Sequence, residues 1–365
     1  MKHFFLFLSL SVLCVYCTPE TSTSENTTEP TPATTNTDSL RYDGETNLSN
    51  IKQLTFGGDN AEAYWSFDNS MLSFQAKNAA WGAECDQIYF MSADGFDSDR
   101  PPLISTGRGR TTCAYFMPGD TTILYASTHL GGDACPPEPG RENGYVWPIY
   151  ADFDIFVANL EGNIVQQLTD DPGYDAEATV SPDGQKIVFT STRSGDLELY
   201  TMNIDGSDVR QVTKDLGYDG GAFFSPDSKK LVFRASRPQG EKADMYKDLL
   251  TKNLVRPSDM EVFICDVDGS NLKQITQLGG ANWAPYFHPS GERILFSSNH
   301  HVEGGRQFNI FSVDLNGADL RQHTFDAAFD AFPMFSPDGK RLAFSSNRNN
   351  GGGRSTNVFV ADWND

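Results

Sequence analysis

The sequence has little basic charge and lacks the signatures of two common classes of hydrolase. Of its 365 residues, 28 are Lys or Arg and 49 are Asp or Glu, which gives a net charge of −21. Because this charge repels phosphate backbones and anionic lipid headgroups, we expect no nucleic-acid partner. Neither a G-x-S-x-G nucleophile elbow nor an H-E-x-x-H zinc motif occurs. No catalytic residue is therefore assigned.

Long apolar runs are also missing, except at the N-terminus. Met1 to Leu13 (MKHFFLFLSLSVL) has one Lys followed by an apolar run that is too short to span a bilayer as a helix. Its length and charge are typical of an export signal. Cys17 follows, and Thr18 to Leu40 consists mostly of Thr, Ser, Pro, Glu and Asn, a composition that cannot bury a core.

This order of export signal, cysteine, polar spacer and folded domain resembles that of bacterial lipoproteins. The resemblance implies that Cys17 is lipidated and that the protein lies in the periplasm, the outer membrane or the cell surface, with membrane contact only through the lipid. Tyr16 stands where that family has a small residue, so simple secretion is the alternative. We expect an export signal over residues 1–17, a disordered tether over 18–46 and a folded domain over 47–365.

The remainder of the chain contains a repeat. In Asp175 to Arg193 (DAEATVSPDGQKIVFTSTR), two apolar or β-branched runs flank Ser-Pro-Asp-Gly, where Pro presets φ and Gly accepts a positive φ. This pattern predicts a β-hairpin. Five further stretches have the same pattern: Asn60 to Asn78, Thr111 to His129, Asp219 to Arg237, Asn282 to His300 and Asp330 to Arg348. We therefore expect a protein of six repeats.

Each hairpin is followed by two more runs joined by an Asp-Gly type of turn, which predicts four strands per repeat. The sixth repeat ends with its third strand, Asn357 to Trp363. Leu48 to Thr55 has the Q-L-T ending of a fourth strand, and no hairpin precedes it. We expect this N-terminal strand to complete the last repeat. The predicted fold is all-β, a six-bladed β-propeller of four-stranded antiparallel blades.

The motif aromatic-Ser-Pro-Asp-Gly-Lys-x-apolar-x-Phe-x-Ser-x-Arg resembles the TolB-like propeller repeat, a distant relative of the WD-type repeat. The resemblance covers nearly all of residues 47–363 and is strongest in the third and sixth copies. TolB has an additional α/β domain before its propeller, whereas the tether occupies that place here. The resemblance therefore implies the fold and does not by itself imply a role in the Tol–Pal envelope system.

Strand direction predicts that the first strands begin, and the second strands end, on one face of the propeller. Concave polar sites on rigid scaffolds are usual positions for ligands. We expect a ligand-binding cup on this face, formed by Glu62, His129, Asp175, Glu177, Arg193, Asp219, Arg237, Asn282, His300, Asp330 and Arg348. For the arginines the alternative is structural, because Asp and Arg at fixed positions can pair and hold adjacent blades. Glu62 and Glu177 are expected to point toward the channel.

Two long insertions, Leu130 to Ala151 and Pro238 to Asp259, emerge on the same face. Tyr145 and Trp147 in the first insertion favour an ordered lid, since aromatic side chains bury large areas. In the second insertion, the spacing of Met245, Leu249 and Leu250 predicts a short helix.

The cysteines near this face predict a crosslink. An exported compartment permits disulfides, and Cys85, Cys113 and Cys135 are all expected close to the cup. We expect one disulfide among the three and a buried thiol at the remaining position. Which two cysteines pair does not follow from the sequence.

These observations favour a binding or scaffold module of the cell envelope. Its expected partner is an envelope protein or a small polar ligand, its expected state is a monomer, and no metal or other cofactor is expected, because His129 and His300 belong to opposite blades. The alternative is a propeller lyase or hydrolase that acts on a saccharide or peptide. In that case Glu62, Glu177, His129 and His300 would be its acid, base or ligand groups.

Overall fold

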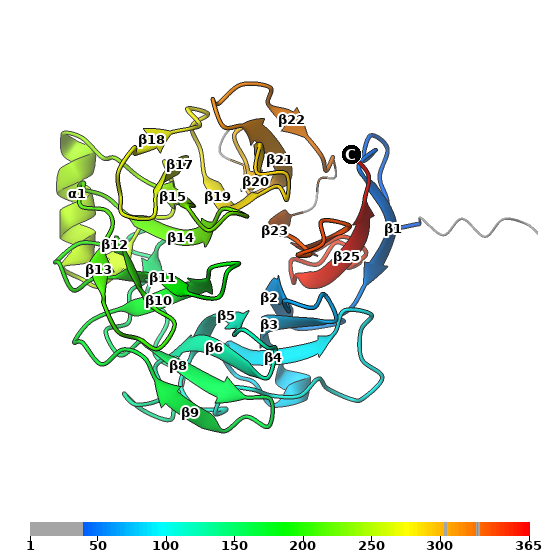
Figure 1. Ribbon diagram of the computed structural model, residues 1–365, viewed down its shortest axis with the longest axis horizontal. Helices are drawn as coiled ribbons and strands as arrows, with labels where there is room; N and C mark the ends of the chain where they lie inside the picture. Colours follow the sequence, from blue (N-terminus) through cyan, green and yellow to red (C-terminus); the bar gives the residue numbers. More distant parts are fainter. Residues whose placement is uncertain (1–38, 303–304, 326, 328) are drawn as a thin grey trace, which may run out of the picture. The chain divides into compact units, whose positions relative to one another are not determined.

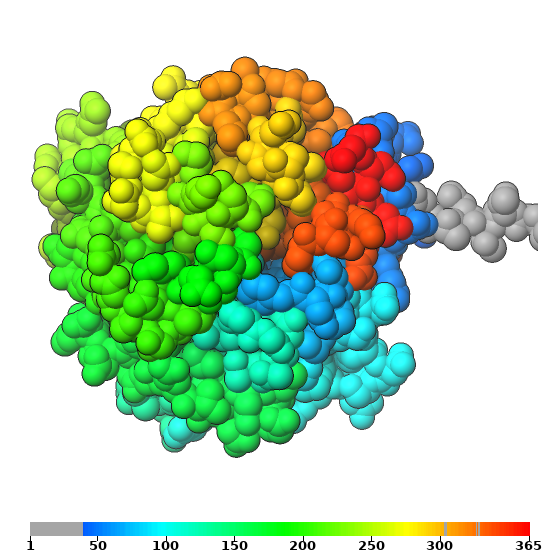
Figure 2. Space-filling model, in the orientation of Figure 1, coloured from blue at the N-terminus to red at the C-terminus, as the bar shows by residue number. Residues whose placement is uncertain are grey.

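The computed structural model describes residues 39–302, 305–325, 327 and 329–365. Within these residues the sheets are arranged as six blades around a common axis (Figure 1). Neighbouring blades pack directly against one another on the face shown in Figure 2. This confirms the predicted six-bladed β-propeller. The export segment, Cys17 and residues 18–38 lie outside the described residues.

The blades follow one another in chain order, each with its first strand innermost. The first blade consists of β2 (Asp59–Trp65), β3 (Met71–Lys77) and β4 (Gln87–Ser92), and the second of β5 (Thr111–Phe116), β6 (Thr122–Ser127), β8 (Asp154–Asn159) and β9 (Ile164–Gln167). The third blade consists of β10 (Asp175–Val180), β11 (Lys186–Ser191), β12 (Glu198–Asn203) and β13 (Arg210–Gln211), and the fourth of β14 (Asp219–Phe224), β15 (Lys230–Ala235), β17 (Glu261–Asp266) and β18 (Lys273–Gln274). The fifth blade consists of β19 (Asn282–Phe287), β20 (Arg293–Ser298), β21 (Asn309–Asp314) and β22 (Arg321–Gln322), and the sixth of β23 (Asp330–Phe335), β24 (Arg341–Ser346), β25 (Asn357–Trp363) and β1 (Leu48–Gln53). No helix in the described part of the chain is long and apolar enough to cross a membrane.

The ring closes through the two ends of the folded chain. Strand β1 pairs antiparallel with β25, so the last sheet has the order β1-β25-β24-β23 (Figure 1). Leu48 and Ile51 of β1 pack into the same buried cluster as Phe359 of β25. The predicted closure by an N-terminal strand is confirmed, and this strand covers the edge that β25 would otherwise expose.

A threonine at the end of the fourth strand fastens it to the third strand. Its hydroxyl accepts the N–H of a third-strand residue, as in Thr169 with Ile155 at 2.9 Å and Thr55 with Val358 at 2.9 Å. In the first blade, residues 102–105 take the place of a fourth strand, and Ser105 accepts the N–H of Ile88 at 3.0 Å. The repeated Leu-Thr or Val-Thr ending therefore has a direct structural cause.

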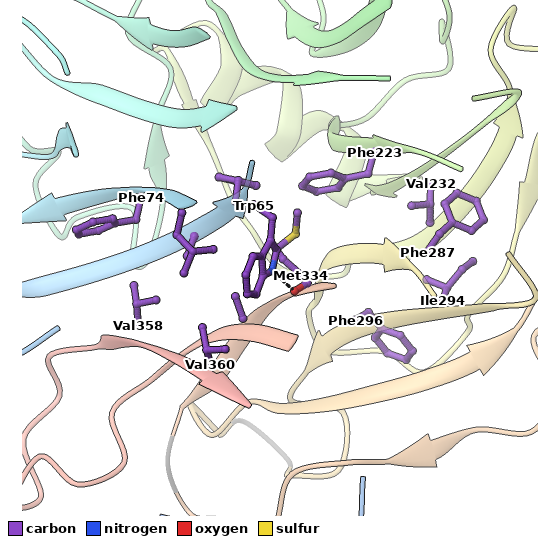
Figure 3. Close-up of a cluster of buried hydrophobic side chains, with 14 of the residues drawn as sticks. Trp65, Phe74, Phe223, Val232, Phe287, Ile294, Phe296, Met334, Val358 and Val360 are labelled. Atoms are coloured by element: carbon purple, nitrogen blue, oxygen red, sulfur yellow. Dashed lines mark hydrogen bonds between the residues drawn. The ribbon is translucent and has the colours of Figure 1, made fainter. Parts of the chain in front are cut away.

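Apolar side chains of the inner strands join the blades around the axis. In the cluster shown in Figure 3, Trp65 of the first blade packs among residues of the fourth, fifth and sixth blades, including Phe223 and Phe296. The Trp65 indole N–H also donates a 2.9 Å hydrogen bond to the Met334 carbonyl. A polar bond inside an apolar cluster fixes the relative position of the first and sixth blades, because a buried indole N–H without an acceptor is costly.

Arg348 holds the entering chain against the sixth blade. Its guanidinium is fully buried and lies 2.8 Å from the Asp330 carboxylate and 3.0 Å from that of Glu45, and it also donates to the Leu40 carbonyl at 3.0 Å. Glu45 belongs to the end of the predicted tether, yet its side chain is fully buried. Folded structure therefore begins before residue 47, because this ion pair draws the preceding residues onto the propeller.

We predict that Arg348→Met lowers the free energy of unfolding by about 3–5 kcal/mol, because it leaves two buried carboxylates without their cation. Urea denaturation at neutral pH measures the change. Arg210→Met is the control, since it removes an ion pair with Asp208 in which Arg210 is 72% exposed. It should unfold like the wild type. Equal effects of the two substitutions would show that the Arg348 cluster does not stabilise the closed ring.

Candidate functional site

Every innermost strand contains a β-bulge at its centre. The pairing register with the second strand shifts there in all six blades. One residue in each bulge has a positive φ, a conformation that is strained for side chains larger than glycine. These residues are Glu62 (54°), Cys113 (43°), Glu177 (57°), Gly221 (57°), Ala284 (46°) and Phe332 (57°). We call them the bulge ring.

The bulge ring lines a central cavity of about 240 Å³. A bulge changes the direction of its side chain relative to regular strand alternation, and here all six bulge residues contribute to the cavity wall. The polar members Glu62, Cys113 and Glu177 come from the first three blades, whereas Ala284 and Phe332 come from the last two. The cavity therefore has a polar side and an apolar side.

Glu177 is held as a buried carboxylate by one cation and three hydrogen-bond donors. It forms an ion pair with Arg234. It also accepts from the hydroxyls of Tyr218 and Thr190, each at 2.7 Å, and from the N–H of Gly221 at 2.9 Å. The Arg234 guanidinium carbon lies 5.2 Å from the ring centroid of Tyr218 and 5.3 Å from that of Trp147. Both contacts are favourable for a cation.

Gly221 provides the space for this ion pair. A Cβ atom built at Gly221 would lie 2.0 Å from Nη1 of Arg234, so any larger residue would displace the guanidinium. Arg234 lies in the second strand of its blade and pairs with Gly220, the residue before the bulge. In the other five blades the residue that pairs with the one before the bulge is uncharged: Gln75, Ala126, Thr190, Ser297 and Ser345. The sequence prediction missed Arg234. An alignment of the second strands would have revealed it as the one charged residue at this position.

Glu62 is the other carboxyl group of the bulge ring, and its surroundings differ. It accepts hydrogen bonds from the Tyr64 hydroxyl and the Cys113 thiol, each at 2.9 Å. No Lys, Arg or His in the described part of the chain forms an ion pair with it. Burial raises the pKa of Glu62; the hydrogen bonds of Cys113 and Tyr64 and the charge of Arg234 oppose this, whereas the charge of Glu177 adds to it.

The thiol beside Glu62 stays protonated. Burial raises the pKa of Cys113 well above its ordinary value, and the neighbouring charges of Glu62 and Glu177 raise it further. The prediction of one disulfide and one buried thiol is confirmed, because Cys85 is bonded to Cys135 and Cys113 is free and buried. The disulfide attaches the first insertion to the loop before β4.

The two insertions are joined to each other above the cavity wall. Strand β7 (Trp147–Pro148) pairs with β16 (Leu254–Val255) in a sheet of their own. Trp147 lines the cavity and contacts Trp283, with ring centroids 5.3 Å apart. Tyr145, in contrast, is 66% exposed and accepts a hydrogen bond from the Trp147 indole. Of the two predicted lid residues, only Trp147 reaches the cavity.

The second insertion contains the expected helix, α1 (Glu241–Leu250). Its buried residues are Tyr246 and Leu249, whereas Met245 is 44% exposed. Leu249 is buried as predicted, whereas Tyr246 takes the place expected for Met245. The Tyr246 hydroxyl donates a hydrogen bond to the half-buried carboxylate of Asp196, which draws this side chain rather than Met245 toward the blade.

Of the eleven predicted cup residues, only Glu62 and Glu177 line the cavity. The Asp–Arg pairs form within single blades rather than between adjacent ones: Asp175 with Arg193 at 2.8 Å, Asp219 with Arg237 at 3.1 Å and Asp330 with Arg348 at 2.8 Å. Residues two apart share a face in a regular strand, which is why these aspartates were expected beside the glutamates. The bulge between them breaks that alternation.

The remaining predicted residues also bond locally, away from the cavity lining. Asn282 and His300 both contact the Ser298 hydroxyl, at 2.7 and 2.8 Å, and His129 contacts that of Ser127 at 2.9 Å. Burial lowers the pKa of both histidines. Within the described residues, no group of three or more His, Cys, Asp or Glu side chains is arranged to hold a metal ion.

We predict that Gly221→Ala is more destabilising than Gly351→Ala. Both glycines have nearly the same φ, 57° and 56°, so both substitutions incur a similar backbone cost of about 1–2 kcal/mol. A Cβ at Gly351 meets nothing within 4 Å, whereas one at Gly221 meets Arg234. Gly221→Ala should therefore lower the free energy of unfolding by about 3 kcal/mol more than Gly351→Ala does, as expected for breaking a buried ion pair. Equal urea-denaturation midpoints would contradict the spatial role of Gly221.

We also predict a pH-dependent effect of Glu62→Gln. Because the pKa of Glu62 is raised in the folded state, its contribution to stability is complete below the ordinary value of 4.5 and is lost as pH rises through the folded value. The stability of the wild type relative to Glu62→Gln should therefore fall as pH rises above about 4.5, by at most about 1.4 kcal/mol per pH unit. Thermal or urea unfolding at several pH values measures this difference, and a constant difference would contradict the raised pKa.

Comparisons with known proteins agree with this architecture. The family model of the TolB beta propeller domain matches residues 150–256 and 255–364, more than half of the chain. A search of curated proteins found no match. Similar solved structures include a TolB from Agrobacterium tumefaciens (18% identity, TM-score 0.54, covering 84% of this chain and 91% of that one) and TolB from Acinetobacter baumannii (18%, 0.53, 84% and 63%).

A third similar structure is a gluconolactonase from Xanthomonas campestris, with 14% identity, a TM-score of 0.54, and coverage of 87% of this chain and 91% of that one. At these identities the solved structures establish the fold alone. The family match begins in the second blade, before β8, and continues through β25, and the preceding strands repeat the same bulge positions. The chain belongs to the TolB beta propeller domain family.

Proposed function

We propose that this protein is an exported, lipid-anchored propeller of the cell envelope that binds a small polar ligand in its central cavity. One observation carries the proposal: six bulges direct their residues into one cavity of about 240 Å³ that contains buried polar groups. Pockets for small ligands combine apolar walls with a few polar groups in this way. The apolar N-terminal segment and Cys17 support export and anchoring.

The energetic cost of the cavity supports a binding role. Glu62, Glu177 and Phe332 all have positive φ values, and strained backbone of this kind concentrates at functional sites. Glu62 adds the cost of a half-buried acid without an ion-pair partner among the described residues. A propeller that served only as a spacer would gain stability from an apolar residue at this position.

Binding of an envelope protein remains the alternative within this class. The acidic surface and the exposed loops of the two insertions would then make the contacts. The cavity argues for the small ligand, because Trp147 and its neighbours Pro148 and Ile149 line the cavity and would obstruct an incoming protein chain.

An enzymatic role is the second candidate, and the unequal surroundings of the two glutamates favour it. Burial raises the pKa of Glu62, while Glu177 forms an ion pair with Arg234 and accepts three further hydrogen bonds. Lyases and hydrolases use two carboxyl groups in different environments as general acid and base. Turnover of a saccharide or peptide that Glu62→Gln abolishes would establish this candidate.

The test uses the full-length protein purified from a bacterial envelope. Native mass spectrometry would detect a co-purified small molecule, and a thermal-shift screen of polar metabolites would identify further ligands, since a ligand that binds only the folded state raises Tm. We expect Trp147→Ala to weaken binding at least about tenfold and Leu130→Ala, at an exposed position of the same insertion, to leave it unchanged. Absence of any small ligand, together with capture of an envelope protein by both variants equally, would overturn the proposal.

A further inference from the structure

The two glutamates of the bulge ring occupy equivalent positions in different blades. Each is the residue with positive φ in its first strand, and each accepts a hydrogen bond from a tyrosine hydroxyl. Each also receives a bond from the bulge residue of the next blade: the N–H of Gly221 for Glu177 and the thiol of Cys113 for Glu62. The two sites are therefore variants of one arrangement.

The cation is the part that differs between them. Arg234 pairs in register with Gly220, and the residue that occupies the same register position beside Glu62 is Ala126, opposite Thr112. Ala126 is fully buried and has no charge. The bulge residue of the same blade is Cys113, whereas the blade of Arg234 has Gly221 there. Because a Cβ atom at Gly221 would collide with Arg234, the side chain of Cys113 would likewise exclude an arginine from the position of Ala126. The chain therefore supplies a cation to Glu177 and none to Glu62.

The charges around the cavity leave one acid unbalanced. The lining contains the carboxyl groups of Glu62, Glu177 and Asp86 and the guanidinium groups of Arg110 and Arg234. Arg234 pairs with Glu177, and Arg110 lies 3.9 Å from Asp86. Arg110 also pairs with Glu138, which is 58% exposed. Glu62 is therefore the carboxyl group of the inner wall that has no ion-pair partner among the described residues.

Aromatic side chains surround this carboxyl group. Tyr64, Tyr174, Trp147, Trp283 and Phe332 line the same cavity. The faces of such rings attract cations, most strongly where water is excluded. Arg234 demonstrates that this wall accepts a cation, because its guanidinium lies over two of the rings that line the cavity while it pairs with Glu177.

We infer that the ligand is a small organic cation, an ammonium or guanidinium group on a compact apolar body, whose charged head binds Glu62 as Arg234 binds Glu177. This inference rests on the proposed binding function and adds the chemical class of the ligand. The apolar body would contact Trp283, Ala284 and Phe332 on the apolar side. The cavity volume lies just below the range of about 300–1,000 Å³ that is usual for ligand pockets, which favours a small molecule.

Binding has a proton balance that can be measured. Because burial raises the pKa of Glu62, its carboxyl group in the empty cavity keeps its proton to a higher pH than an ordinary glutamate does. The groups that face it are Tyr64, Cys113, Glu177 and Arg234. When the cation binds, Glu62 becomes a carboxylate and its proton passes to the buffer, while the ligand keeps its own. Up to one proton is released for each ligand bound.

The experiment compares benzylammonium with benzyl alcohol and benzoate, which have similar shapes and different charges. Isothermal titration calorimetry of the full-length protein, in two buffers that differ in protonation enthalpy, gives the affinities and the proton release. We expect benzylammonium to bind at least about tenfold more tightly than benzyl alcohol, the ratio that a hydrogen bond to a charged group provides. Benzoate should not bind, because it offers Glu62 no cation and would place a second carboxyl group beside it.

Two variants complete the test. Glu62→Gln keeps the shape of the side chain and should remove both the preference for benzylammonium and the proton release. Glu161→Gln, at an exposed turn of the second blade, is the matched control and should change neither. Stronger binding of benzyl alcohol or benzoate, or benzylammonium binding that Glu62→Gln does not weaken, would overturn the inference and leave the cavity as a site for another class of ligand. Failure of all three probes would also overturn it, and the mass-spectrometric search would still decide the binding function.

Discussion

The structure depends on closure of the ring. The strands of a propeller blade form hydrogen bonds only with strands of the same blade. The blades are therefore held in a circle by side chains between them and by the junction of the first blade with the last. Here that junction is the pairing of β1 with β25, supported by the buried contact of Arg348 with Glu45 and Asp330. Closure fixes the distance of every inner strand from the axis. It thereby brings the six bulges to the same cavity.

Repetition and divergence together produce the site. The strand order, the hairpin turns and the threonine at the end of the fourth strand recur because each satisfies backbone groups in the same way, and in the first blade Ser105 takes the place of the threonine. At the bulge position the blades differ, and the cavity acquires a polar side with Glu62 and Glu177 and an apolar side with Phe332. Gly221 shows how the two kinds of position are coupled, since its missing side chain admits Arg234.

Sequence reasoning found part of the candidate site. It identified Glu62 and Glu177 because of their place in the first strands, and Trp147 because it belongs to a long aromatic insertion. It could not separate them from residues such as Asp175 and Arg193, which bond to each other within one blade. The distinction depends on the bulge, where a single residue with positive φ reverses strand alternation. The sequence carries no local signal for a positive φ at glutamate.

The sequence by itself determined the repeat, the number of blades, the N-terminal strand that completes the last blade, and one disulfide among three cysteines. These features follow from local pattern and chain order, because hairpin turns and apolar alternation act over a few residues. Only the tertiary structure decided that Arg234 meets Glu177 and that no cation in the described residues meets Glu62. Those neighbours come from different blades, and their distances depend on ring closure and on the direction that each bulge gives to its side chain.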